Sequence, residues 1–430
     1  MRKTRTGQPA AQQCGVGALA ASACRVARHG DWPILQGSEV VRVRIGAGAG
    51  IVQAPVRLGA FYFAYFCYLG AFGAYFSLWL ADRGYTPAEI SIVLAAPQVM
   101  RIFAPALWGW LADRTGSRRA VVSVSSLMAA LCFAAIGLQE TLVGVLFAIS
   151  AMALFSSGVL PLVEATALAV LTGRPGGYGP VRLWGSIGFM ASVLLVGALL
   201  DARSVAWLLP VVSLLMGSAF VASLALPETA PRPAHEAETR LWPVFARGPV
   251  IAFFGACFCM TVAHGALYAF YSIHLVQYGY SKTLVGVMWA IGVVAEIGIF
   301  LLLPQMFRRF SARTVLVASF VAAAVRFAAI GWGAGSVTLM VVAQVLHAMT
   351  FGTYHAAAVA MVHRIFAGPL EVRGQALYAS LSYGLGGTAG MLLSGWLWQT
   401  WGAEITFSVS ALAGIAGALL ATMTPKDRTP

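Results

Sequence analysis

The chain is a series of long apolar stretches, each about 20 residues, separated by short segments that carry most of the polar residues. An apolar stretch of this length crosses a bilayer as an α-helix, whereas a membrane β-barrel would show short alternating strands. The pattern predicts an all-α membrane protein with twelve transmembrane helices and both termini on one side. The expected helices cover residues 58–82, 88–112, 120–138, 142–165, 181–201, 204–226, 249–276, 284–304, 314–333, 336–360, 375–398 and 401–423.

Composition and charge fit a membrane protein. Hydrophobic residues make up 59% of the 430 and charged residues 10%, whereas soluble domains carry about 25% charged residues. The net charge is +13, and membrane topology explains it better than nucleic-acid binding, because the cations gather in one set of alternate loops. That set holds Arg114, Arg118, Arg119, Arg174, Arg182, Arg232, Arg240, Arg247, Arg308, Arg309, Arg313, Arg364, Arg373, Lys426 and Arg428, and the other set holds Arg83, Arg203 and Lys282.

The positive-inside rule then places both termini in the cytoplasm of a bacterial cell, with the helices in the inner membrane. Residues 1–57 begin with a Gly/Ala/Arg-rich segment that has no apolar core long enough to span, so we expect a disordered cytoplasmic extension. A proline-rich polar segment at 227–248 separates two six-helix bundles, 58–226 and 249–424, and is expected to be a cytoplasmic linker.

The two bundles resemble each other in sequence. The segment Gly70–Thr86 aligns without gaps on Gly265–Ser281 at a shift of 195 positions, and a second echo at a shift of 198 pairs Gly188 with Gly386 and Gly197 with Gly395. Convergent use of glycine in packed helices is the alternative explanation. The gapless match favours two parallel six-helix repeats, an arrangement that binds substrate near the bilayer midplane between the repeats.

Four charged residues lie inside stretches that are otherwise almost purely apolar: Arg101, Glu164, Glu296 and Arg326. A charge at bilayer depth costs roughly 2.5–3.5 kcal/mol on insertion scales, so such residues normally face a bundle interior or a water-filled pathway. They indicate that the chain moves something across the membrane.

Enzymatic and metal sites are not expected. The six cysteines and the scattered histidines lack metal-ligand spacing, so no metal site is predicted. The sequence holds no nucleophile elbow and no phosphate loop, which argues against an enzyme and against an ATP-driven pump. The expected driving force is a proton gradient without a cofactor, and the expected partners are a small-molecule substrate and the lipid bilayer, with the protein a monomer.

The segment after the second expected helix reads Gly109-Trp-Leu-Ala-Asp113-Arg114-Thr-Gly116-Ser-Arg118-Arg119. It resembles the signature of the major facilitator superfamily, G-x-x-x-D-R-x-G-x-R-R, and the resemblance implies the major facilitator fold and a conformational latch formed by these residues. Physically, Gly109 would allow two helices to approach closely, Asp113 would accept hydrogen bonds or pair with an arginine, and Gly116 would allow a tight turn.

The first half is also similar to lactose permease, a member of that superfamily, in residues 61–80 and in the segments around Glu164 and Arg182. The resemblance implies that Glu164 and Arg182 form a substrate-binding pair. Phe189 occupies the position of a tryptophan that stacks on the sugar in lactose permease. A phenylalanine at this position still offers an aromatic ring for stacking. An ordinary positive-inside arginine at a helix start is the alternative for Arg182.

In the second half, Glu296, Arg326 and His347 match lactose permease residues involved in proton coupling. The chain departs from that pattern at the main acidic proton site, which is Thr350 here. It also departs at two lysine positions, which are occupied by Gln344 and Tyr383. Glu296 is therefore the expected proton carrier, and the coupling scheme of lactose permease is not carried over whole.

Residues 249–383 resemble bacterial phenylpropionate permeases most, through the strings GVVAEIGIF, FRRFSAR, VRFAAIG and VLHAMTFGTYHAAA. Arg101 fits that branch, and a carboxylate substrate would offset the charges of the deep arginines. We therefore expect a proton-coupled symporter for a small organic acid such as phenylpropionate, with Arg101 among the substrate-binding residues. The open alternatives are a sugar or nucleoside permease, an efflux transporter and a non-transporting membrane sensor on the same scaffold.

Overall fold

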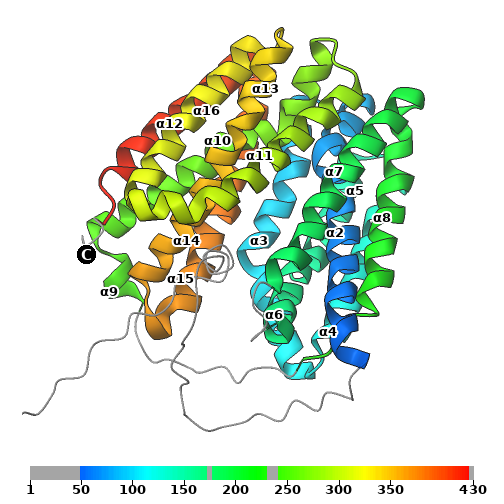
Figure 1. Cartoon of the computed structure of the whole chain (residues 1–430). Helices are drawn as coiled ribbons and strands as arrows, with labels where there is room; N and C mark the ends of the chain where they lie inside the picture. The colour runs from blue at the N-terminus through cyan, green and yellow to red at the C-terminus, as the bar shows by residue number, and fades with distance from the viewer. Residues whose placement is uncertain (1–48, 172–176, 230–240, 426–430) are drawn as a thin grey trace, which may run out of the picture.

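A computed structural model describes residues 49–171, 177–229 and 241–425 (Figure 1). Within these residues the regular structure is helical, and eleven helical segments are long and apolar enough to cross a membrane. The last one, Glu371–Ala421, is interrupted at Gly402, which adopts φ 81° and ψ −174°. This non-helical residue divides it into two helices, so the described chain contains the twelve predicted crossings.

The first six crossings agree with the expected spans apart from one break. They are formed by α2 (Ala49–Asp82), α3 (Pro87–Thr115), α4 (Arg118–Ala134) with η1 (Ala135–Leu138), α5 (Leu142–Ser156) with α6 (Val159–Leu171), α7 (Tyr178–Ala202), and η2 (Val205–Trp207) with α8 (Leu208–Ser223). The fourth crossing is broken between α5 and α6, where the indole of Trp108 packs against Gly158 and donates to the Leu154 carbonyl at 2.6 Å. Most of the predicted N-terminal extension lies outside the described residues, and 49–57 begin α2.

The second six crossings follow a short helix, α9 (Trp242–Phe245), within the expected linker, of which 230–240 lie outside the described residues. They are formed by α10 (Gly248–Gln277), α11 (Lys282–Arg309), α12 (Ala312–Gly333), α13 (Val337–Val345) with η3 (Ala348–Thr353) and α14 (Tyr354–Ile365), and, after η4 (Gly368–Leu370), α15 (Glu371–Tyr378) with η5 (Ala379–Gly386) and α16 (Gly387–Ala421). Both η3 and η5 are π-helical. Wide turns of this kind are rare and often mark functional sites.

The two halves repeat the same packing in atomic detail. In the first half α2 packs along α7, and in the second α10 packs along α16. Gly188 faces the backbone carbonyl of Phe63, and its repeat partner Gly386 faces the carbonyl of Phe258, which is the residue 195 positions after Phe63. Only a residue without a side chain allows backbones to approach this closely. The glycine echo in the sequence therefore reflects parallel repeats.

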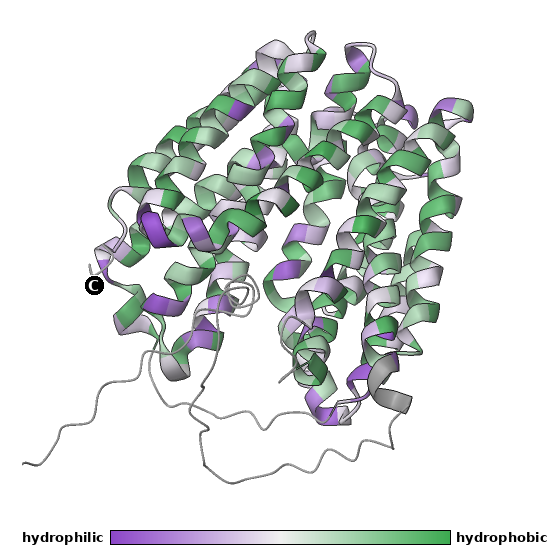
Figure 2. Ribbon diagram, viewed as in Figure 1, coloured by the Kyte–Doolittle hydropathy of each residue, from purple (hydrophilic) through white to green (hydrophobic). Residues whose placement is uncertain are grey.

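Hydrophobic residues cover the outer faces of the helices, and hydrophilic residues gather at the helix ends and at a few positions within the spans (Figure 2). Large apolar side chains such as Phe147, Leu195, Leu301 and Trp332 are exposed on these faces. An apolar surface of this extent requires lipid around it, since water would disfavour it.

The halves meet at one end and separate at the other. We call the end at which α8 ends and α10 begins the linker end (bottom in Figure 1) and the opposite end the far end. Contacts between the halves join α2 to α10 and α11, α3 to α10, η5 and α16, and α7 to α11. Helices α6, α14 and α15, which form the linker end, make no comparable contact across the halves within the described chain.

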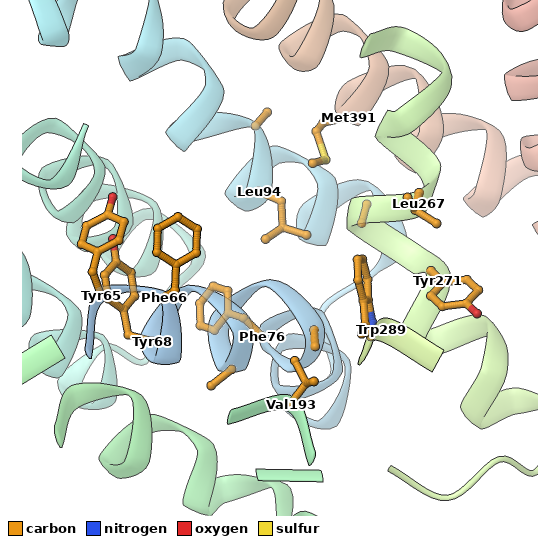
Figure 3. Packing of buried hydrophobic residues seen from close by; sticks show 14 of the residues in the cluster. Tyr65, Phe66, Tyr68, Phe76, Leu94, Val193, Leu267, Tyr271, Trp289 and Met391 are labelled. Carbon is orange, nitrogen blue, oxygen red and sulfur yellow. The ribbon is translucent and has the colours of Figure 1, made fainter. Parts of the chain in front are cut away.

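Buried side chains seal the region where the halves meet. Leu94 of α3, Val193 of α7, Trp289 of α11 and Met391 of α16 belong to one buried cluster that draws on both halves (Figure 3). The contacts between the halves are therefore concentrated toward the far end, whereas the linker-end helices α6, α14 and α15 stay apart from the opposite half.

The glycine contacts predict a matched pair of stability effects. Gly188→Ala places a methyl group against the Phe63 carbonyl and should destabilise the fold by about 1–3 kcal/mol. Gly217→Ala in α8, where no atom lies within 4 Å of the added carbon, should be neutral or stabilising by up to about 1 kcal/mol. Thermal unfolding of the purified protein in detergent measures both, and equal midpoints for the two variants would contradict the packing argument.

Candidate functional site

Arg182 lies near the start of α7, with its guanidinium against the aromatic face of α2. The guanidinium carbon is 4.1 Å from the ring centroid of Phe66 and 5.7 Å from that of Tyr62. Gly185 makes room for it, because a side-chain carbon at Gly185 would lie 2.7 Å from Nη1 of Arg182. Such a cation–π contact holds a charge in place while leaving its hydrogen-bond donors free.

Two carboxylates flank this arginine, one from each half. Glu164 of α6 and Glu296 of α11 both lie within electrostatic range of Arg182. Neither forms an ion pair within 4.0 Å in the described part of the chain. Glu164 and Arg182 thus form no direct salt bridge in this conformation, and their pairing in substrate binding stays a prediction.

Arg101 occupies the first-half side of the meeting region. Its side chain is exposed, yet it lies within electrostatic range of the hydroxyl groups of Tyr65, Tyr68, Tyr268 and Tyr383. The adjacent backbone touches the second half, since Ser380 of η5 donates to the Ile102 carbonyl at 3.2 Å. Arg101 is therefore an exposed cation close to the seam between the halves, and no carboxylate of the described residues pairs with it.

Arg326 of α12 is fully buried and ties α12 to the π-helical turn of the tenth crossing. Its Nε donates to the Ala343 carbonyl at 2.9 Å, and its Nη1 donates to the Thr350 hydroxyl at 3.0 Å. Its Nη2 has no hydrogen-bond partner in the described residues. A buried guanidinium with an unsatisfied donor lowers the stability of the fold, so packing alone does not explain why an arginine stands here.

The groups around Arg326 are also incompletely satisfied. His347 stacks on Phe351 with ring centroids 5.5 Å apart. Neither Nδ1 of His347 nor Nε2 of Gln344 has a hydrogen-bond partner among the described residues. Gly292 lets α11 approach both side chains. One turn along α11, Glu296 packs against Gly352 of η3. The structure thus brings Glu296, Arg326 and His347 to one region of the second half, and their part in proton coupling stays a prediction.

Phe189 lies on α7 and is half-buried. Its ring is 3.2 Å from a side-chain carbon built at Gly70, so it packs against α2. A stacking role toward a substrate stays a prediction.

The latch residues lie at the linker end. Gly116 ends α3 with φ 70°, which is the tight turn that was expected. No atom lies within 4 Å of a side-chain carbon built at Gly109, so the expected close helix approach at Gly109 is wrong for this conformation. Asp113 and Arg114 are exposed, and Arg114 lies over the Trp110 ring at 5.4 Å.

The basic end of the latch contacts the residues that follow α8. Ser117 donates to Glu228 at 2.8 Å, the Nε of Arg119 lies 3.7 Å from the same carboxylate, and Arg118 donates to Thr229 at 3.4 Å. The latch is therefore held to the start of the linker in this conformation.

Sequence reasoning gave no role to the tyrosines of the site, although it placed Tyr383 at a position that holds a lysine in lactose permease. The hydroxyl of Tyr383 lies 3.2 Å from Nδ1 of His355. It also accepts a hydrogen bond from the Tyr378 hydroxyl at 3.5 Å. Tyr268 lies within electrostatic range of Arg101, Glu296 and Arg326. A tyrosine inside an apolar stretch looks the same in sequence whether it faces lipid, another helix or a pathway, so no local signal distinguishes these two.

Comparison with known proteins gives concordant matches. A family model described as MFS_1 like family matches residues 56–409. The chain is 31% identical over 376 residues to the probable 3-phenylpropionic acid transporter of Escherichia coli (strain K12), covering 86% of this chain and 98% of that protein. It is 27% identical over 389 residues to maltose permease of Geobacillus stearothermophilus, covering 87% and 97%.

Among solved structures, a variant of the nucleoside transporter NupG superposes with a TM-score of 0.78 at 18% identity, covering 86% of this chain and 100% of that chain. At this identity the likeness shows the shared fold alone.

The buried guanidinium predicts an order of stability for two similar-sized substitutions at Thr350. Thr350→Val removes the hydroxyl that accepts from Arg326 and should destabilise the protein by about 1.5–3 kcal/mol, the range for hydrogen bonds to charged groups. Thr350→Asp supplies a counter-charge and should be the more stable of the two. Unfolding midpoints in detergent measure the order, and a Val variant more stable than the Asp variant would show that Arg326 does not depend on this acceptor.

Proposed function

Because the chain belongs to the MFS_1 like family of major facilitator transporters, we propose that it carries a small organic acid across the bacterial inner membrane by alternating access. An aromatic acid such as phenylpropionate is the substrate that we propose, in line with the printed function of the Escherichia coli relative. Transport itself follows from the family, and the choice of an acid rests on the charges between the halves.

The observation that carries this proposal is the environment of Arg101. Its exposed guanidinium stands between the halves without a carboxylate partner in the described residues, near hydroxyls from both halves. With Arg182 at the start of α7, the deep charges come to three arginines and two glutamates, so an anionic substrate supplies the missing negative charge. A carboxylate that binds Arg101 and reaches Tyr268 or Tyr383 contacts both halves, as a substrate must when it couples their movement.

The conformation supports alternating access with one side open. The halves are sealed at the far end and apart at the linker end. The positive-inside rule places the linker end and both termini in the cytoplasm, so we assign this state to the inward-facing half of the cycle. Exposed Asp113 fits a latch that is not engaged in that half.

Proton coupling rests on the two carboxylates beside Arg182. Glu296 belongs to the second half and lies within electrostatic range of Arg182 in the first. Protonation of Glu296 changes the charge balance across the seam between the halves, which gives the proton gradient a means to bias their separation. In this scheme a monomer works with the proton gradient alone and needs no cofactor.

A sugar or nucleoside permease is the second candidate. It is supported by the similarity to maltose permease and by the position of Glu164 beside Arg182, where a carboxylate can accept hydrogen bonds from substrate hydroxyls. In that case Arg101 would serve helix packing instead of substrate charge.

Replacing Arg101 separates the two candidates. Arg101→Gln should lower uptake of phenylpropionate at least about tenfold, the loss expected for one charge-assisted hydrogen bond. Residual transport of the uncharged amide analogue should not fall. Uptake into proteoliposomes measures transport of the acid and of the amide. Arg57→Gln, which removes an exposed surface arginine, is the matched control. Equal loss of acid and amide would make Arg101 structural and would favour the sugar or nucleoside permease.

Glu296→Gln tests the proton carrier. The variant should lose accumulation driven by a pH gradient and keep exchange of labelled for unlabelled substrate, because exchange needs binding and movement without net proton transfer. Accumulation in wild-type vesicles should collapse when a protonophore is added. Undiminished accumulation by the variant would move the proton role to Glu164 or indicate a uniporter.

A further inference from the structure

At the far end, the N-terminus of α11 is bound by a carboxylate from the other half. Oδ1 of Asp201, near the end of α7, accepts from the backbone N–H of Lys282 at 2.8 Å. Oδ2 accepts from the backbone N–H of Thr283 at 2.8 Å and from its hydroxyl at 2.6 Å. The Lys282 ammonium lies 3.9 Å from Oδ1. A negative charge is favourable at a helix N-terminus, where backbone donors lack partners within the helix.

The second contact of this kind joins the N-terminus of α3 to α16. Oε1 of Gln399 accepts from the backbone N–H of Ala88 at 3.1 Å. Both helices begin with the same local capping, since Thr86 accepts from the N–H of Glu89 and Ser281 accepts from that of Leu284. The side chain from the other half therefore binds donors that the helix's own cap leaves free.

These two contacts are equivalent by the internal repeat. Gln399 follows Asp201 by 198 positions, and Thr283 follows Ala88 by 195, which are the shifts that relate the halves elsewhere. The acceptors differ because the donors differ. Pro87 is the first-half equivalent of Lys282, and as a proline it offers no backbone N–H. Ala88 is the equivalent of Thr283, and its side chain offers no hydroxyl. The neutral amide of Gln399 therefore accepts one hydrogen bond from α3. The carboxylate of Asp201 accepts three from α11.

The neighbouring contacts add to this difference. The Tyr75 hydroxyl lies 2.6 Å from the Val193 carbonyl and 3.0 Å from the Lys282 carbonyl, across the seam between α7 and α11. Its repeat equivalent is Phe270, which has no hydroxyl. The α7–α11 seam is therefore the more strongly hydrogen-bonded of the two seams that close the far end.

We propose that Asp201 and Gln399 form two unequal clamps of one far-end gate, and that the Asp201 clamp is the main contact holding the gate closed. Each cycle of alternating access must break both clamps, because the N-termini of α3 and α11 separate from the opposite half when the far end opens. Asp201 and its partners lie at the aqueous edge, so water replaces their hydrogen bonds after separation. Opening is therefore reversible, and it starts at the weaker α3–α16 seam.

The test measures conformation, so it does not depend on which substrate is carried. In full-length protein whose six native cysteines are replaced, spin labels on Glu140→Cys and Thr338→Cys report the far end. A second pair, on Pro180→Cys and Val372→Cys, reports the linker end. These positions are exposed and lie in opposite halves. Pulsed electron–electron double resonance in lipid nanodiscs gives the distance distribution for each pair of labels. The far-end distribution gives the ratio of molecules with an open far end to those with a closed one.

Asp201→Ala should raise that ratio at least about tenfold, as expected for losing hydrogen bonds to a charged group, and should shorten the linker-end distance in step. Gln399→Ala, the matched control, should raise it less, by roughly two- to tenfold. Asp201→Asn, which keeps the shape and loses the charge, should fall between, and it gives the readout if the Ala variant does not fold. Unchanged distances in both Asp201 variants, or a larger effect of Gln399→Ala, would overturn the proposal.

Discussion

A charged side chain cannot face the hydrocarbon of a bilayer, and this constraint explains how the two halves of the protein are arranged. Arg326 is enclosed completely by its own half, where a carbonyl and a hydroxyl take two of its donors. Arg101, Arg182, Glu164 and Glu296 are instead partly or fully exposed, and Glu296 and Arg182, which belong to opposite halves, lie within electrostatic range of each other. These charges need both halves nearby and also need water, so the halves cannot fuse into a single apolar core. The same requirement that shelters the charges keeps a pathway between them.

The fold and the positions of the deep charges could be predicted from sequence because both depend on strong, local signals. An apolar run of about 20 residues has one stable form in a membrane, and a charge inside such a run must turn inward. The repeated glycines could also be recognised, since a contact between backbones excludes every side chain, as at Gly188 and Gly386.

What could not be predicted depends on packing between distant segments. The break between α5 and α6 arises where Trp108 meets Gly158, and Trp108 belongs to a different helix. The motif suggested a close approach at Gly109 that this conformation does not have, because one sequence must serve every conformation of a transport cycle. Tyr268 and Tyr383 were missed because orientation around a helix axis, rather than residue type, makes a tyrosine part of a pathway.

The π-helical turns have a consequence for how the two halves differ. The offset between the repeats is 195 positions at Gly265 and 198 at Gly386, so the second half is three residues longer than the first between these points. One extra residue in an α-helix turns everything after it by about 100° and would move a packed face into lipid. A π turn absorbs the insertion locally and leaves the following helix in register. Thr350 and Tyr383, two of the positions at which this chain departs from lactose permease, lie in η3 and η5. Residues in these turns can therefore differ from their counterparts in the first half while the helices that follow keep the packing that the two halves share.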